Sequence, residues 1–244
     1  MVVKIVGDIG NTETKICIIK SNKIIKRLNI KTINLNNKKL KKKLKILNKY
    51  SFEKIIFSSV VPSAYKNIKS YLFKKFKTQV IELKETNFKN FLNIKVNKKQ
   101  IGSDRLANAI SVCQNNKNYI ILDFGTATTF DVVVKKDYLG GIIAPGVNLS
   151  LQTLITNASL ISNVNLSKIK SVIGKNTSSA VKSGFYWGYA GLIDSLINLI
   201  TKDTKKKYNI ILTGGLAHLF KSSIKVRSTV DKDLTIKGLI KLIN

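Results

Sequence analysis

One pattern occurs twice in this chain of 244 residues and constrains its fold more than any other feature. An apolar strand ends at an aspartate, and a glycine with amide or hydroxyl side chains follows before the next strand. The two copies read Asp8-Ile9-Gly10-Asn11-Thr12 and Asp123-Phe124-Gly125-Thr126-Ala127-Thr128-Thr129. Glycine lets the backbone approach a phosphate closely, hydroxyls donate to it, and a carboxylate holds a hard cation. One copy would fit an ordinary hairpin turn. Two copies predict a duplicated phosphate-binding domain.

The order of the expected elements repeats in the same way. Strands are expected at residues 2–7, 15–20, 23–30, 54–57, 79–83, 119–122, 129–134, 138–143, 209–212 and 225–230, and helices at residues 36–48, 64–75, 106–113, 149–158, 178–201 and 236–243. Residues 84–100 are expected to form a loop, and the polar segment 114–118 separates two domains, 1–115 and 116–244. Three strands followed by alternating helices and strands favour an α/β fold with mixed sheets. We expect the two domains to face a central cleft where Asp8 and Asp123 meet.

The net charge of +30 invites a nucleic-acid interpretation. Only three of the 43 basic residues are arginines, however, and lysine is abundant together with isoleucine and asparagine, whose codons are all AT-rich. The basic residues also lack interleaved aromatic side chains. We interpret the charge as compositional drift over solvated faces, and we expect no specific nucleic-acid partner.

Other bulk features favour a soluble cytoplasmic protein with no membrane partner. Cys17 and Cys113 are too far apart in sequence to suggest a disulfide framework or a zinc motif. Asp8 interrupts the apolar N-terminal segment, so a signal sequence is not expected. No apolar run approaches the roughly 18 residues of a membrane-spanning helix.

Several common catalytic sequence motifs are absent from this sequence. Lys175 has no glycine five residues before it and no hydroxyl residue after it, so the P-loop pattern is absent. The G-x-S-x-G motif of hydrolases is also absent. The sole histidine, His218, is interpreted as a helix-start residue, so the expected general base is a carboxylate: Asp8, Asp104 or Asp123.

The segment Ile101-Gly102-Ser103-Asp104-Arg105 opens the helix expected at 106–113. Ser103 or Asp104 is a candidate helix cap. Arg105 is one of only three arginines, which suggests a need for a planar fork that binds a carboxylate or phosphate. The alternative is a capping carboxylate beside a surface guanidinium.

These segments, in this order, resemble type III pantothenate kinase, a family within the acetate kinase, sugar kinase and actin superfamily. Further matching pieces are Ser59-Val60-Val61-Pro62, Gly174-Lys175-Asn176-Thr177 and Thr213-Gly214-Gly215. The resemblance covers essentially the whole chain. It implies two ribonuclease H-like, or actin-like ATPase, domains.

The resemblance also implies an activity and a set of site residues. The activity is ATP-dependent phosphorylation of pantothenate to 4'-phosphopantothenate, the first step of coenzyme A biosynthesis, with Mg²⁺ and a monovalent cation (K⁺ or NH₄⁺) in a homodimer. By position, the base is Asp104, and the pantothenate contacts are Gly102, Ser103, Asp104, Arg105 and Thr177. The ATP contacts are Asp8, Ile9, Gly10, Asn11, Thr12, Glu13, Thr14, Lys15 and Thr126, and the cation ligands are Asp8 and Asp123.

Elementary chemistry agrees with these roles, because phosphoryl transfer needs positioning, charge neutralisation and a base for the attacking alcohol. The chain departs from the family where a tyrosine and a proline commonly precede the glycine turn; here residues 94–98 contain neither. Two alternatives stay open: a regulatory or nucleic-acid-binding relative on the same fold, and a kinase of another small hydroxylated substrate. Leu192, Leu196 and Leu199 on the helix expected at 178–201 belong either to a dimer contact or to the core.

Overall fold

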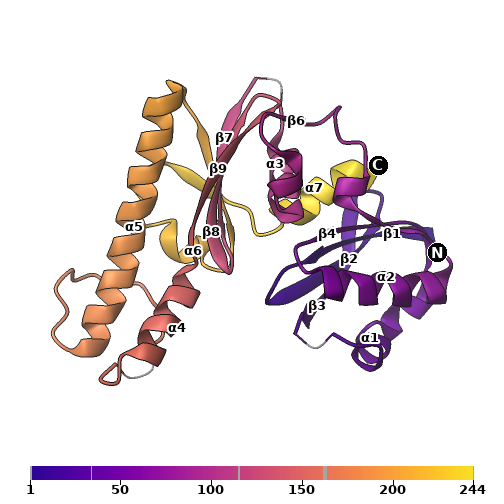
Figure 1. Ribbon diagram of the computed structural model, residues 1–244, viewed down its shortest axis with the longest axis horizontal. Helices are drawn as coiled ribbons and strands as arrows, with labels where there is room; N and C mark the ends of the chain where they lie inside the picture. The colour runs from indigo at the N-terminus through magenta and orange to yellow at the C-terminus, as the bar shows by residue number, and fades with distance from the viewer. Residues whose placement is uncertain (1, 34, 115, 162–163, 244) are drawn as a thin grey trace. The chain divides into compact units, whose positions relative to one another are not determined.

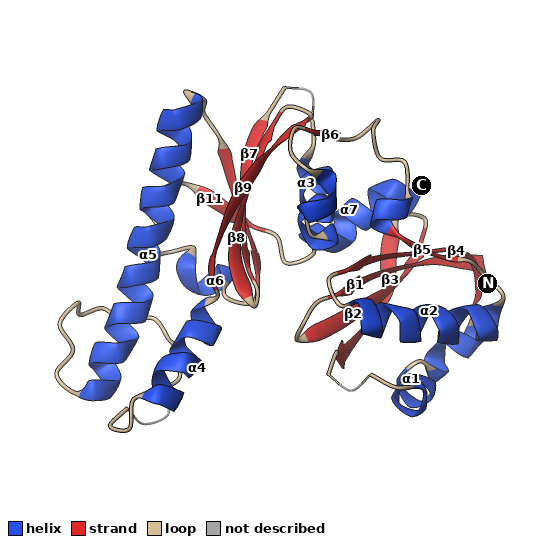
Figure 2. Ribbon diagram, in the orientation of Figure 1, coloured by secondary structure: helices blue, strands red, loops and turns tan. Residues whose placement is uncertain are grey.

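The computed structural model describes residues 2–33, 35–114, 116–161 and 164–243. Contacts divide the chain into two compact units: residues 1–113 with 233–244, and residues 114–232. Each unit is built on a sheet that mixes parallel and antiparallel strands, with helices packed against it (Figures 1 and 2). The predicted α/β class with two mixed sheets is therefore confirmed.

The first unit contains strands β1 (Val2–Ile9), β2 (Glu13–Lys20), β3 (Lys23–Lys31), β4 (Ser51–Ser59), β5 (Val80–Glu82) and β6 (Asn93–Ile94), and helices α1 (Asn37–Lys43), α2 (Pro62–Phe76), α3 (Ser103–Val112) and α7 (Leu234–Ile243). The five strands of its sheet have the order β3-β2-β1-β4-β5. The first three pair antiparallel, and β4 and β5 continue the sheet in parallel. This places the carboxyl ends of β1, β4 and β5 at one edge.

Two pairs of helices cover the sheet of the first unit. Helices α1 and α2 lie on one face and α3 and α7 on the other (Figure 2). Ile5 and Ile55 of the sheet belong to the same core cluster as Ile68 and Leu72 of α2. Ile68 and Leu72 are fully buried, and burying such a side chain contributes roughly 1.5–3 kcal/mol. This packing keeps β1 and β4 fixed beneath the turns that follow them.

The second unit contains strands β7 (Asn118–Phe124), β8 (Ala127–Val134), β9 (Asp137–Pro145), β10 (Asn209–Gly214) and β11 (Ser228–Val230), and helices α4 (Val147–Asn157), α5 (Thr177–Thr204) and α6 (Ala217–Phe220). Its strands run in the order β11-β10-β7-β8-β9, with β10 and β11 parallel to β7. Each strand thus has a counterpart in the order and direction of the first sheet. The three helices lie on one face of this sheet (Figure 1). The topology repeats as the turn sequences predicted.

Helix α7 packs in the first unit, although the second unit precedes it in sequence. Lys241 Nζ donates to the carbonyl of Ile110 near the end of α3, at 3.2 Å. Lys4 and Lys54 Nζ donate to the carbonyl of Ile243, at 3.2 and 3.4 Å. Cations at helix C-termini complement the helix dipole. The division into domains 1–115 and 116–244 stays a prediction, and residue 115 lies outside the described residues.

Several predicted boundaries are wrong in ways that have local causes. Helix α3 begins at Ser103, three residues earlier than predicted, and its N-cap is Gly102, which makes no side-chain cap bond. The predicted capping by Ser103 or Asp104 is therefore incorrect. The helix expected at 36–48 ends at Lys43 and is followed by a 3₁₀ turn over Lys45–Lys49. Residues 84–100 hold short 3₁₀ turns and β6 rather than a plain loop.

Helix α5 is longer than predicted, and its buried stripe is shifted by one residue. Its core positions include Ile193, Ile197 and Ile200, whereas Leu199 is 57% exposed. Leu192 and Leu196 lie beside the core and are partly buried. The leucine stripe is therefore neither wholly core nor wholly surface.

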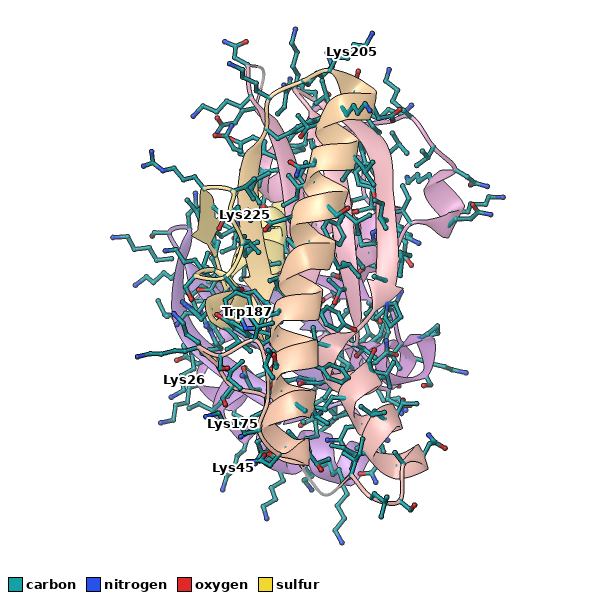
Figure 3. All side chains as sticks on the ribbon, turned by 90° about the vertical axis from the view of Figure 1, so that its left-hand side faces the viewer. Lys26, Lys45, Lys175, Trp187, Lys205 and Lys225 are labelled. Atoms are coloured by element: carbon teal, nitrogen blue, oxygen red, sulfur yellow. The ribbon has the colours of Figure 1, made fainter. Side chains whose placement is uncertain are left out.

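Lysine side chains extend outward from the ribbon, as those of Lys175, Lys205 and Lys225 do in the second unit (Figure 3). Within the part of the chain that the structure describes, no helix combines the length and apolarity needed to cross a bilayer.

Candidate active site

The turn between β1 and β2 presents polar groups at the carboxyl edge of the first sheet. Asp8 is registered with Lys15 across the hairpin, and the amide of Gly10 donates to the carbonyl of Glu13 at 3.0 Å. Asn11 and Thr12 are exposed at the tip. The turn thus offers a carboxylate, an amide, a hydroxyl and backbone donors from one short segment.

Two predicted ATP contacts in this turn have buried side chains. Ile9 and Thr14 are fully buried, and the Thr14 hydroxyl is hydrogen-bonded to the Thr32 hydroxyl at 2.9 Å. Only their backbone groups remain for a ligand. Their side chains fix the base of the turn instead.

The turn between β7 and β8 repeats this design in the second unit. Asp123 is registered with Thr129, and the amide of Gly125 donates to the carbonyl of Ala127 at 3.1 Å. The loop is one residue shorter than in the first unit, where the corresponding bond spans Gly10 to Glu13. Thr126 is exposed at its tip.

Two glycines let other segments approach the second turn. Gly214 has a φ of +85°, and a Cβ built there would lie 2.6 Å from Asp123 Oδ1. A Cβ on Gly146 would overlap the carbonyl of Thr126. Side chains at these two positions would displace the turn, so Gly214 and Gly146 have a steric reason, whereas a Cβ on Gly215 would meet nothing within 4 Å.

Helix α3, which begins at Ser103 and carries Asp104, belongs to the same unit as the turn between β1 and β2. A Cβ on Gly102 would lie 3.5 Å from Val60 Cγ1, at the end of β4, and would overlap Asp104 Oδ1. The same Oδ1 accepts the backbone N–H of Arg105 at 2.8 Å. Glycine at 102 therefore allows α3 to start against β4 with Asp104 folded back over the first turn of the helix.

Asp104 has the electrostatics of a candidate base. Burial raises the pKa of its carboxyl group, and the N–H and guanidinium of Arg105, together with Lys84, act against that rise. A carboxylate with a raised pKa accepts a proton more readily near neutral pH. Perturbed pKa values of this kind are typical of functional sites.

Ser103 is fixed by a hydrogen bond to Glu82, a residue at the end of β5 that the sequence did not indicate as part of this site. Its side chain is 1% exposed, and its hydroxyl donates to Glu82 Oε1 at the end of β5. Glu82 Oε2 in turn accepts the N–H of Lys84 at 2.6 Å. The only sequence signal for Glu82 is a rare acidic residue at a strand end in a basic chain.

Thr177 is the exposed first residue of α5. The preceding Asn176 caps the helix by accepting the N–H of Ser179 at 2.9 Å. A Cβ on Gly174 would overlap the backbone of Ala180. The Gly174–Thr177 segment is therefore packed tightly against the first turn of α5.

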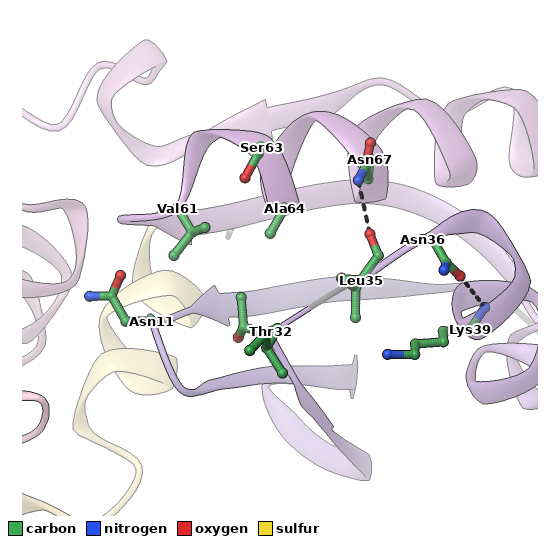
Figure 4. A pocket seen from close by; sticks show the side chains of 10 residues that line it. Asn11, Thr32, Leu35, Asn36, Lys39, Val61, Ser63, Ala64 and Asn67 are labelled. Atoms are coloured by element: carbon green, nitrogen blue, oxygen red, sulfur yellow. Dashed lines mark hydrogen bonds between the residues drawn. The ribbon is translucent and has the colours of Figure 1, made fainter.

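A pocket of about 840 Å³ lies beside the first turn, with Asn11 in its wall (Figure 4). It is lined by Asn11, Thr32, Ile33, Leu35, Asn36, Lys39, Val61, Ser63, Ala64 and Asn67. Asn67 Nδ2 donates to the carbonyl of Leu35 at 2.8 Å and closes one side. The volume suits a small organic molecule, and the lining mixes polar and apolar side chains.

The predicted site residues therefore fall into three groups. The segments Asp8–Lys15 and Gly102–Arg105 belong to the first unit, Asp123 and Thr126 form one turn of the second unit, and Thr177 starts α5. No cluster of three or more His, Cys, Asp or Glu side chains suited to a metal occurs among the described residues.

Comparison with known proteins gives consistent results. The family described as Type III pantothenate kinase matches residues 4–199. A type III pantothenate kinase of Pelagibacter ubique is 56% identical over 240 residues, which cover 97% of this chain and 97% of that protein.

Two solved structures show the fold alone, because their identities are low. A Campylobacter jejuni protein assigned to the Baf family of transcriptional activators has a TM-score of 0.60 at 20% identity, covering 98% of this chain and 96% of its own. A glucokinase of the ROK family from Streptomyces griseus has a TM-score of 0.56 at 9% identity and covers 99% of both chains. Both belong to the actin-like ATPase fold that the family resemblance implies.

Proposed function

The chain belongs to the type III pantothenate kinase family, and from this membership we propose how its residues carry out the reaction. The enzyme transfers a phosphoryl group from ATP to pantothenate and yields 4'-phosphopantothenate, the first step of coenzyme A biosynthesis. The observation that carries the assignment of roles is the half-buried Asp104 beside Arg105, in the same unit as the Asp8 turn.

Asp104 is proposed as the general base. Its carboxylate takes the proton of the terminal hydroxyl of pantothenate as that oxygen attacks the γ-phosphorus of ATP. The raised pKa supports this role, because it makes the Asp104 carboxylate a stronger base than an ordinary aspartate. ADP leaves as the bond between the γ-phosphorus and the bridging oxygen breaks.

Pantothenate is proposed to contact Gly102, Arg105 and Thr177. The guanidinium of Arg105 offers a fork that binds a carboxylate in a bidentate way. Ser103 contributes through its backbone, because its buried hydroxyl is already bonded to Glu82.

ATP phosphates are proposed to lie on the segment Asp8–Lys15, with Thr126 as a further contact. Exposed Asn11 and Thr12 donate from side chains, whereas buried Ile9 and Thr14 take part only through the backbone. Phosphoryl transfer depends mainly on such positioning and charge neutralisation.

Cation sites are proposed at the two turn aspartates. Mg²⁺ suits Asp8 and K⁺ suits Asp123, since hard metal cations prefer carboxylate and hydroxyl oxygens. NH₄⁺ would bind the same oxygens at Asp123 by donating hydrogen bonds. The hydroxyl oxygen of Thr129, registered with Asp123, is buried and has no hydrogen-bond partner among the described residues, which fits an oxygen ligand set. Bound cations would neutralise the charge of the phosphates.

We also propose a homodimer in a cytoplasmic location, with no specific nucleic-acid partner. We propose that residues 1–115 and 116–244 are the two copies of the duplicated domain. The dimer is supported by exposed apolar side chains of the second unit: Leu149, Leu154, Leu160, Val172, Ile173 and Leu199. Static light scattering of the purified protein tests it. A fully active monomer would contradict the dimer.

The proposed roles are tested by a coupled assay of ADP release with pantothenate, pantetheine and several hexoses, with and without K⁺. We expect turnover with pantothenate, and a loss of about 10²–10⁴-fold in kcat for Asp104→Asn. Asp203→Asn on exposed α5 is the matched control and keeps full activity. A near-normal kcat in Asp104→Asn would remove the base assignment, and turnover with a hexose alone would favour another kinase.

A further inference from the structure

We propose that the hydroxyl of Ser58 is a positioning group for a hydrated divalent cation at Asp8. In this proposal Ser58 holds a water molecule that is bound to the cation and lies beside the Asp8 carboxylate. The inference deepens the proposed function, because it rests on a cation at the first turn. It assigns Ser58 no contact with pantothenate.

Strand register places Ser58 next to Asp8. The parallel pair β1–β4 aligns Gly7 with Phe57 and Asp8 with Ser58. A Cβ on Gly7 would overlap the ring of Phe57, and Phe57 belongs to the core beneath α1 and α2. Because successive side chains alternate between the faces of a sheet, Asp8 and Ser58 share the opposite face.

That opposite face carries the helix that starts at the candidate base. Helices α3 and α7 contact β4, and Gly102 at the start of α3 lies against Val60. Ser58 is therefore situated on the strand that joins the phosphate turn to the first turn of α3. A hydroxyl there is placed to hold a water molecule beside the Asp8 carboxylate.

The Ser58 hydroxyl is buried and makes no hydrogen bond with the described residues. Ser58 is 0% exposed, and its oxygen has no hydrogen-bond partner among the residues that the structure describes. The adjacent Ser59 behaves differently, since its hydroxyl accepts the N–H of Val61 at 3.2 Å and donates to the Val61 carbonyl. A buried polar group without a partner is unfavourable. A water or ion that arrives with the ligand would supply the missing partner.

The second unit holds a related arrangement, on a different neighbouring strand. Asp123 is registered with Thr129, and the Thr129 hydroxyl is likewise buried without a partner in the described part of the chain. The strand partner of each turn aspartate, Ser58 or Thr129, thus has a buried hydroxyl that makes no hydrogen bond with the described residues. The neighbour comes from a parallel strand in one unit and from an antiparallel strand in the other.

The experiment compares Ser58→Ala with Ser228→Ala. Ser228 also has a buried hydroxyl without a partner among the described residues, but it pairs with Ile210, at the opposite end of β10 from Thr213, the neighbour of Asp123. Mn²⁺ binding in the presence of ATP is measured by electron paramagnetic resonance, alongside unfolding temperature, half-saturating Mg²⁺, and KM for pantothenate.

We expect Ser58→Ala to weaken Mn²⁺ binding and to raise the half-saturating Mg²⁺ concentration by about 10-fold, as loss of a group that orients a metal ligand typically does. KM for pantothenate stays unchanged, and the unfolding temperature does not fall. Ser228→Ala leaves Mn²⁺ binding at the wild-type level. Ser58→Cys fills the same volume with a much weaker hydrogen-bonding group and should behave as Ser58→Ala does.

Wild-type Mn²⁺ binding in Ser58→Ala would overturn the proposal, as would equal losses in Ser58→Ala and Ser228→Ala. Normal Mn²⁺ binding in Ser58→Cys would also overturn it, because volume rather than the hydroxyl would then matter. A wild-type protein that binds Mn²⁺ and ATP but does not turn over pantothenate would instead contradict the proposed function. The two failures are therefore distinguishable.

Discussion

Replacing Gly238 by alanine should disturb the active site from the far side of α3. A Cβ on Gly238 would overlap the carbonyl oxygen of Ala107 and lie 2.7 Å from its carbonyl carbon and 3.1 Å from its Cα. Carbon atoms in favourable contact lie about 3.5–4.0 Å apart. All three neighbouring atoms are backbone, so α3 and α7 must separate by about 1 Å.

The expected magnitude combines two opposing contributions. Overpacking of a tight contact costs about 1–3 kcal/mol, whereas replacing glycine by alanine inside a helix stabilises by roughly 0.5–1 kcal/mol. The net loss of about 0–2.5 kcal/mol lowers the unfolding temperature by about 2–4 °C per kcal/mol for a protein of this size. Asp104 is one helical turn before Ala107, and a misplacement of about 1 Å can cost roughly 10²-fold in rate.

Gly191→Ala in α5 is the matched control, because nothing lies within 4 Å of a Cβ built there. It should raise the unfolding temperature slightly and leave kcat unchanged. Calorimetry and the coupled assay on both variants give the two quantities. If Gly238→Ala is as stable and as active as Gly191→Ala, the contact between α3 and α7 does not position Asp104.

Four further predictions concern charge. The Arg105 guanidinium lowers the pKa of Asp104, so Arg105→Gln should move the acid limb of kcat/KM to higher pH, and a pH profile with an unchanged limb would contradict this. Because burial raises the pKa of Asp104 in the folded state, its ionisation costs stability as pH rises through that pKa; Asp104→Asn should therefore unfold at an equal or higher temperature at pH 7, with no advantage well below the ordinary aspartate range. Asp123→Ala should abolish activation by K⁺ or NH₄⁺ together with most activity, whereas wild-type turnover that is indifferent to K⁺ would leave Asp123 with magnesium alone. Nucleic-acid binding should be non-specific and disappear as salt rises, as counterion release by dispersed lysines predicts; a sequence-specific complex at physiological salt would favour the regulatory alternative.

The sequence was sufficient where the determinant was local. The two aspartate turns and the strands around them were predictable because alternating apolar residues and glycine turns act over a few positions. The start of α3 was not, because Ser103 at that start is buried and bonded to Glu82, 21 residues earlier in the chain, and such a contact is not visible in the local sequence. The buried stripe of α5 was misplaced because leucine and isoleucine occupy adjacent positions, so both stripes have helical spacing.

Two opposing effects act on Asp104, and both depend on packing between distant segments. Burial under the rest of the unit raises the pKa of its carboxyl group. Its place in the first turn of α3 favours the ionised form, since helix N-termini stabilise anions. The contacts of Lys241 with the end of α3 hold that helix against α7. The two effects shift the pKa of Asp104 in opposite directions, and a general base must be ionised before the reaction and protonated after it. The last ten residues that the structure describes therefore contribute to the proton transfer that we propose for a carboxylate 130 positions earlier.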